Sequence, residues 1–196
     1  MKPYSIIDNV FDEVTVSSIF EECKKHLKDN LLANDQLKIT NSILDCHGLA
    51  LSTDKYFPYS IPCWNKFCLI IKKHVVDYCK EDPIAITPFS CWAEKSGKID
   101  GSTFTDSPVK AMDIEGQVKN KFIRTVYNLK TPNKKYGTKL IYKEDTKFVY
   151  SEKNRLLIYD DTCISTHYYP SYSPRYNIIF DWYINTPFKV PDWILP

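Results

Sequence analysis

The stretch of sequence that decides the fold is residues 154–184, which read NRLLIYDDTCISTHYYPSYSPRYNIIFDWYI. Its segments 155–159 and 175–184 are rich in β-branched and aromatic residues, a composition typical of strands. Between them, Asp, Thr, Ser and Pro favour turns. The stretch therefore predicts consecutive short strands, with His167 near the end of one strand and Arg175 at the start of the next.

The same character begins at residue 84. Short segments of β-branched and aromatic residues alternate with turns marked by Pro, Gly, Asn and Asp. The predicted strands are 84–93, 122–129, 138–142, 147–150, 155–159, 163–168 and 175–184. Short strands in such a series, without an intervening helix, indicate an antiparallel sandwich or jelly roll.

The helical patterns lie before residue 84. After a short predicted strand over Tyr4–Val10, Asp12 is placed to cap a helix from Glu13 to Leu27. A second helix, with apolar residues at helical spacing, is predicted from Ile61 until the sequence Glu81-Asp82-Pro83 stops it. Both helices are expected to pack on one sheet.

Length and composition fit one globular domain of the α+β class. We expect a single domain over residues 1–196, with residues 1–83 as a helical buttress and residues 84–196 as the β core. The formal net charge is only +2, from 26 basic and 24 acidic residues. This balance gives no support to a nucleic-acid partner.

Cysteine usage and hydropathy bear on the compartment. The seven cysteines are an odd set without a Cys-x-x-Cys pair, which argues against a zinc knuckle and against a complete disulfide framework. No stretch approaches the roughly 18 apolar residues of a membrane span, and the N-terminus has acidic residues where a signal peptide needs an apolar run. We expect reduced thiols, no membrane contact and a cytoplasmic location.

Strand alternation sorts the residues of the last predicted strand. Arg175, Asn177, Ile179, Asp181 and Tyr183 fall on one face, and the intervening apolar residues fall on the other. A neutral imidazole is a good ligand for transition metals, and a guanidinium group binds a carboxylate through two parallel hydrogen bonds. Taken alone, however, Arg175 also fits an ordinary salt bridge, and His167 fits a polar surface position.

The order of these residues resembles the C-terminal signature of the Fe(II)/2-oxoglutarate-dependent oxygenases, in particular the prolyl-hydroxylase-like branch with its phage and bacterial relatives. The segments YSIIDNVFDEVTVSSIFEECKK (4–25) and RTVYNLKTPNKKYGTKLIY (124–142) resemble other parts of the same family. The resemblance implies a double-stranded β-helix in which His167 binds Fe(II). It also implies that Arg175, with Asn177 beside it, binds the distal carboxylate of 2-oxoglutarate.

One family motif is incomplete in this chain. The family carries His-x-Asp before the strand that begins at Arg124, and the segment at that distance is Ala111-Met112-Asp113. Asp113 can therefore take the carboxylate position of the metal site, while Ala111 stands where the imidazole belongs. An upstream alternative, Phe104-Thr105-Asp106, also lacks the histidine.

The remaining histidines are His26, His47 and His74. Two of them fall on predicted helices, and His47 lies in a stretch that the sequence does not explain. We expect His167 and Asp113 to be the metal ligands, and a two-ligand set should hold Fe(II) weakly.

Three hypotheses follow. The first is a hydroxylase-type Fe(II)/2-oxoglutarate oxygenase, a dioxygenase, with an incomplete metal triad. The second is a catalytically inactive protein of the same fold that acts as a binding or structural module. The third is an unrelated jelly roll. In the first two, the expected small-molecule partner is 2-oxoglutarate or a similar dicarboxylate, and the sequence does not reveal the substrate.

Overall fold

The computed structural model describes residues 3–26, 34–38, 64–81, 85–96, 104–106, 121–131, 136–168 and 175–184. Two helices lie in these residues, α1 (Glu13–His26) and α2 (Trp64–Cys79). The strands are β1 (Tyr4–Asp8), β2 (Asn34–Lys38), β3 (Ile86–Ser96), β4 (Phe104–Asp106), β5 (Lys121–Lys130), β6 (Gly137–Tyr142), β7 (Asp145–Tyr150), β8 (Arg155–Asp160), β9 (Ile164–Tyr168) and β10 (Arg175–Ile184).

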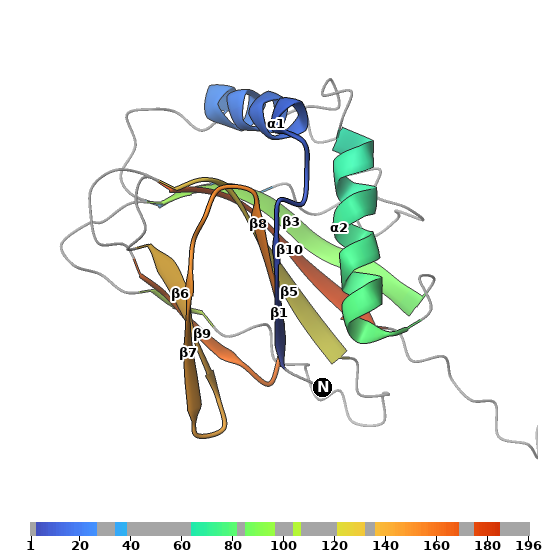
Figure 1. The fold of residues 1–196 in the computed structure, drawn as a ribbon, viewed down its shortest axis with the longest axis vertical. Coiled ribbons are helices and arrows are strands. Elements are labelled where there is room, and N and C mark those ends of the chain that lie inside the picture. Colours follow the sequence, from blue (N-terminus) through green and yellow to red (C-terminus); the bar gives the residue numbers. More distant parts are fainter. Residues whose placement is uncertain are drawn as a thin grey trace, which may run out of the picture.

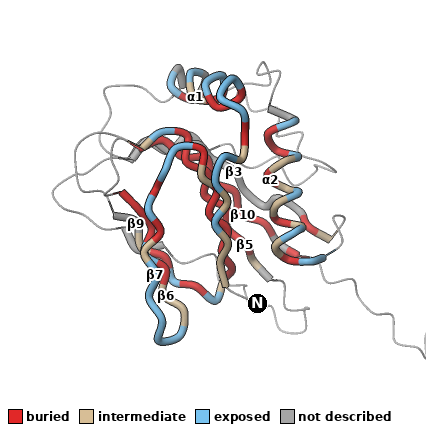
Figure 2. Tube along the Cα trace, in the orientation of Figure 1, coloured by how far each residue is buried: buried red, intermediate tan, exposed pale blue. Residues whose placement is uncertain are grey.

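The strands form two sheets in which each described pairing is antiparallel. The large sheet has the order β1-β8-β5-β10-β3-β2, and the small sheet has the order β4-β9-β6-β7. Both helices lie on one face of the large sheet, and the small sheet lies on the other side (Figure 1). The large sheet is therefore the middle layer, and its central strands are buried (Figure 2).

Helix α1 begins where Asp12 caps it. The carboxylate of Asp12 accepts hydrogen bonds from the backbone N–H of Thr15 at 2.7 Å and from its hydroxyl at 3.0 Å. These bonds lower the pKa of Asp12, because they favour the charged form. The helix buries Val16, Ile19 and Cys23 against the large sheet, as an amphipathic helix does.

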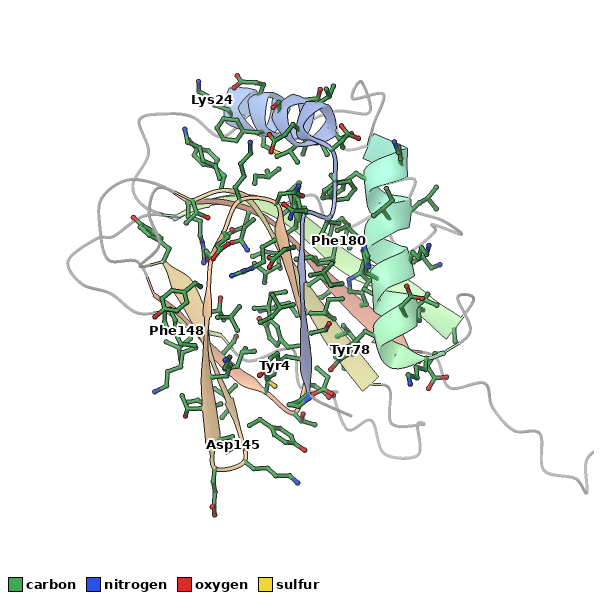
Figure 3. All side chains as sticks on the ribbon, in the orientation of Figure 1. Tyr4, Lys24, Tyr78, Asp145, Phe148 and Phe180 are labelled. Atoms are coloured by element: carbon green, nitrogen blue, oxygen red, sulfur yellow. The ribbon has the colours of Figure 1, made fainter. Side chains whose placement is uncertain are left out.

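Helix α2 covers the same face through an aromatic contact. Phe67 stacks on Phe11 with ring centroids 4.7 Å apart and meets the edge of Tyr127 at 5.2 Å. Figure 3 shows Phe180 and Tyr78 in the layer between the sheet and this helix. Full burial of such a side chain stabilises the fold by about 1.5–3 kcal/mol. Apolar burial therefore fixes the helices to the large sheet. Separately, no helix among the described residues is long and apolar enough to span a membrane.

Asn154 joins the N-terminal segment to the β core. It has a left-handed φ of 63°, which Asn tolerates better than most residues. Its side-chain oxygen accepts from the backbone N–H of Phe11 at 3.0 Å and from the hydroxyl of Tyr127 at 2.8 Å, and its amide donates to the carbonyl of Phe11 at 2.7 Å. One buried side chain thus links β5, β8 and the turn before α1.

Most sequence expectations for the fold are confirmed. The antiparallel sheets, the strand from Tyr4, both helices and the seven predicted strands all occur, with shifted ends. Two short strands, β2 and β4, were not predicted. Residues 1–83 are not only a helical buttress, because they also supply β1 and β2, the two edge strands of the large sheet. The cysteines whose side chains are described (Cys23, Cys68, Cys79 and Cys163) are buried, and none forms a disulfide.

Candidate functional site

The face of β10 that carries Arg175 looks into the space between the two sheets. Ile179 packs there with Val126 of β5 and Leu140 of β6, whereas Ile178 and Phe180 pack toward the helices on the opposite face. This division agrees with the alternation predicted for residues 175–184. Arg175 and Asn177 therefore belong to the face that lines the interior of the sandwich.

The guanidinium group of Arg175 is completely buried and held in one orientation. Its Nη1 donates to the hydroxyl of Ser151, which follows β7, at 2.8 Å. Its Nε and Nη2 donate to the side-chain oxygen of Asn177, at 2.8 and 3.0 Å, in the amide orientation that satisfies both neighbours. Two neutral oxygen atoms, one from β10 and one from the connection after β7, thus fix the plane of the charged group.

Asn128 extends this network into β5. Register places Asn128 directly opposite Asn177, and the Asn177 amide donates to Oδ1 of Asn128 at 2.9 Å. The Asn128 amide donates in turn to the backbone carbonyl of Arg155 in β8, at 3.2 Å. The Arg175 cluster, defined as Arg175, Asn177, Asn128 and Ser151, is therefore anchored in three strands of the large sheet and at the end of β7.

A second buried arginine lies farther along the same face. Arg124 of β5 and Asp181 of β10 are paired in register and form a two-pronged ion pair. Its Nε–Oδ1 distance is 2.6 Å and its Nη2–Oδ2 distance is 2.8 Å. Val126 and Ile179 separate this pair from the Arg175 cluster.

Ser165 shows which face of β9 looks into the same space. Its hydroxyl accepts a hydrogen bond from Tyr159 of β8 at 3.1 Å, and Ser165 is fully buried.

Nearby, burial raises the pKa of the Cys163 thiol to about 11, so this cysteine stays protonated and unreactive at neutral pH.

His167 lies in β9 at the end of the sandwich that holds the Arg175 cluster. Its backbone pairs with Thr138 of β6. Thr138 pairs on its other side with Val149, which lies two residues before Ser151. On the side of β9 away from β6, His167 is opposite Phe104 of β4. The backbone of His167 is described and its side chain is not, while Asp113 and Ala111 lie outside the described residues.

Comparison with solved structures identifies the architecture. The chain resembles a prolyl hydroxylase from Trichoplax adhaerens, with a TM-score of 0.59, 16% identity, and coverage of 94% of this chain and 84% of the other. It resembles a Pseudomonas putida prolyl-4-hydroxylase, with a TM-score of 0.64, 9% identity, and coverage of 93% and 92%. It also resembles EvdO2 from Micromonospora carbonacea, complexed with 2-oxoglutarate, with a TM-score of 0.68, 7% identity, and coverage of 93% and 86%.

Its fold is that of the 2-oxoglutarate-dependent oxygenases. No protein-family model and no curated protein sequence matches the chain. This fold agrees with the resemblance seen in residues 154–184.

The structure does not describe the side chains of the metal ligands expected from the sequence, His167 and Asp113. Within the described part of the chain, no group of three or more His, Cys, Asp and Glu residues converges as a metal site does. Phe104, an apolar residue, takes the register position opposite His167. His74 lies on α2, outside the large sheet (Figure 1), where burial lowers its pKa.

A cavity of about 320 Å³ opens elsewhere in this oxygenase fold. It lies between β1 and the β6–β7 hairpin, where Figure 3 shows Tyr4 on one side and Asp145 on the other. Its lining residues are Pro3, Tyr4, Leu140, Tyr142, Asp145, Thr146 and Lys147. Neither Arg175 nor His167 belongs to it, so it is separate from the Arg175 cluster.

Sequence reasoning missed several residues of this interior. Arg124 and Asn128 could have been found, since they share strand parity with Val126 and lie in a segment that was already predicted as a strand. Ser151 carried no signal, because it lies in the connection between two strands. Only the register of the folded chain brings Ser151 to Arg175.

Proposed function

We propose that the protein binds 2-oxoglutarate or a similar small dicarboxylate between its sheets, with Arg175 receiving the distal carboxylate. The observation that carries the proposal is the complete burial of the Arg175 guanidinium together with its fixed orientation between Ser151 and Asn177. We take the two sheets to be those of a double-stranded β-helix, whose interior holds such a ligand.

The chemistry of the cluster supports this choice. A guanidinium group keeps its charge at all physiological pH values and offers planar donors that match a carboxylate. Ser151 and Asn177 fix its orientation through uncharged oxygen atoms. In a buried setting, a charge-assisted hydrogen bond is about twice as strong as a neutral one. EvdO2, which has the same fold, was solved with 2-oxoglutarate.

Binding rather than catalysis is the function we assign. The contacts of Arg175 bear on ligand binding, whereas a hydroxylase-type oxygenase also needs Fe(II), and the side chains of its expected ligands, His167 and Asp113, are not described. The oxygenase reaction is the second candidate function. It is favoured by the position of His167, which pairs with β6 at the same end of the sandwich as the Arg175 cluster.

Calorimetric titration with 2-oxoglutarate in metal-free buffer tests the binding site. Arg175→Met should weaken binding at least about 30-fold, equivalent to about 2 kcal/mol, because a buried charged hydrogen-bonding partner is lost. Arg155→Met is the matched control, since Arg155 pairs with Asp8 at the edge of the sheet, and it should leave the affinity unchanged. Equal affinity of wild type and Arg175→Met would refute the role of Arg175.

Turnover separates the two candidate functions. The protein is loaded anaerobically with Fe(II) and 2-oxoglutarate, then exposed to oxygen, and succinate is measured. A binding module releases no succinate above the protein-free control. Succinate formation that requires the protein and depends on His167 would favour the oxygenase instead.

A further inference from the structure

Strand β4 lies beside the strand that carries His167. The pairing is antiparallel, with Phe104 opposite His167 and Asp106 opposite Ser165. This segment is the Phe104-Thr105-Asp106 sequence, which the sequence offers as an alternative to Ala111-Met112-Asp113. The register of β4 with β9 therefore favours Phe104-Thr105-Asp106 over Ala111-Met112-Asp113 as the segment beside His167.

The face of β4 follows from that register. Ser165 faces the inter-sheet space, because its hydroxyl bonds to Tyr159 of the large sheet. Residues directly opposite in an antiparallel pair share a face, and so do residues two apart in a strand. Positions 104, 106 and 167 therefore belong to the inter-sheet face, the same interior that the Arg175 cluster lines from the other sheet.

Cross-strand spacing fits a shared ion. Directly opposite positions have Cβ atoms roughly 4.5–5.5 Å apart, and diagonal positions are roughly 7–8 Å apart. Phe104 is the direct neighbour of His167, and Asp106 is a diagonal neighbour. An imidazole and a carboxylate on backbone positions with this spacing can bind one metal ion.

We infer that β4 is the first metal motif of this chain, with Asp106 as its carboxylate and Phe104 in the position of the missing imidazole. This inference rests on the oxygenase-type site proposed above, and it replaces Asp113 by Asp106 in the expected ligand pair. A histidine at position 104, and not at position 111, completes a three-ligand site.

The histidines on the two helices do not supply the imidazole that is missing at position 104. His26 is the last residue of α1, and His74 lies within α2. Both helices cover the face of the large sheet that is turned away from the small sheet (Figure 1). Among the four histidines of the chain, this leaves only His47 as an alternative partner for His167.

The test is the affinity of the metal-free protein for Co(II), measured by calorimetry without 2-oxoglutarate. Phe104→His should raise the affinity at least about tenfold, since one added ligand closes the site. Asp106→Asn in the Phe104→His background should remove the gain. Ala111→His is the matched control and should leave the affinity within about twofold of wild type.

Several results would overturn the inference. They are a gain in Ala111→His without one in Phe104→His, no gain in either variant, or wild-type binding of Co(II) that His47→Ala abolishes. If circular dichroism shows that Phe104→His does not fold, the wild-type background still decides. There Asp106→Asn should weaken residual Co(II) binding and Asp113→Asn should not, and the reverse order refutes the inference.

Failure of this inference can be told apart from failure of the proposed function. The dicarboxylate titration uses metal-free protein and variants of Arg175, whereas the Co(II) titration uses no dicarboxylate and varies β4. Failure of the Co(II) result with intact 2-oxoglutarate binding would reject only the assignment of β4. Loss of the Arg175 effect with an intact Co(II) result would reject only the dicarboxylate site.

Discussion

The inter-sheet face of the large sheet carries two buried arginines with different neighbours. Arg124 meets a carboxylate, Asp181, through two hydrogen bonds. The described contacts of Arg175 are a hydroxyl oxygen from Ser151 and an amide oxygen from Asn177. Both groups are shielded from water, so the chemistry of their neighbours and not their exposure distinguishes them.

The difference assigns separate roles to the two side chains. Arg124 and Asp181 form an ion pair across two neighbouring strands. This pair contributes mainly to strand register and to the stability of the fold. Ser151 and Asn177 orient Arg175 through uncharged oxygens on the inter-sheet face. The variants below either convert one arrangement into the other or remove one of its parts.

Breaking the Arg124–Asp181 pair should have the largest effect. Asp181→Ala leaves a buried guanidinium opposite an apolar side chain, so it should lower the free energy of unfolding by about 3–5 kcal/mol. The double variant Arg124→Met/Asp181→Leu should be much closer to wild type, because no charge stays buried. Urea denaturation followed by circular dichroism measures both, and a double variant as unstable as Asp181→Ala would contradict a purely structural pair.

Asn177→Asp should convert the second arginine into a copy of the first. The new carboxylate lies within hydrogen-bond distance of Nε and Nη2 of Arg175 and competes with any ligand for that charge. We expect 2-oxoglutarate affinity to fall at least tenfold, about 1.4 kcal/mol. An unchanged affinity in Asn177→Asp would mean that ligand does not approach the guanidinium.

Removing one neutral acceptor should have a smaller effect. Ser151→Ala deletes the hydroxyl that accepts a hydrogen bond from Nη1 of Arg175. The loss of one hydrogen bond of this kind costs about 1 kcal/mol of stability. Dicarboxylate affinity should fall more than it does in Ser151→Thr, which retains the hydroxyl. Equal affinities of the two variants would show that Ser151 does not position the guanidinium.

The smallest effect concerns a third arginine, at the sheet edge. Arg155 donates to Asp8 and lowers the pKa of that carboxyl, chiefly through the hydrogen bond. Half of the Asp8 side chain is exposed, so the pair contributes less than about 1 kcal/mol. Because the folded pKa lies below the unfolded value of about 3.9, this contribution is present above that pH and disappears as the pH falls further.

The pH dependence gives the measurement. Asp8→Asn should be slightly less stable than wild type at pH 7, and the two proteins should converge as the pH falls below about 4. High salt should shrink the difference at pH 7, because exposed charges are screened. A gap that persists unchanged at low pH would contradict an electrostatic origin.

The sequence could predict those features that repeat along one strand or helix. Alternation in residues 175–184 correctly placed Arg175 and Asn177 on one face and Phe180 on the other. The Asp12 cap was equally local and equally clear. Such features depend on neighbours in the chain, so periodicity and side-chain chemistry are enough to find them.

Contacts between distant segments could not be predicted in this way. Strand β4 is three residues long and carries no alternation that a sequence reader could use. Its importance comes entirely from its register with β9. Ser151 likewise meets Arg175 only because β7 ends beside β10, and no local pattern contains that information. The metal ligand Asp113, expected from sequence, lies outside the described residues and stays a prediction.

The hydrogen bonds of Asn154 constrain the order in which parts of the fold can form during synthesis. Its hydrogen bonds reach Phe11, 143 residues earlier in the chain, and β1 pairs with β8 in the same region. On the ribosome, the N-terminal strand must therefore wait without its partner until nearly the whole core has emerged. Such long-range closure is slow, and we expect this edge of the large sheet to assemble only after β8 has been synthesised.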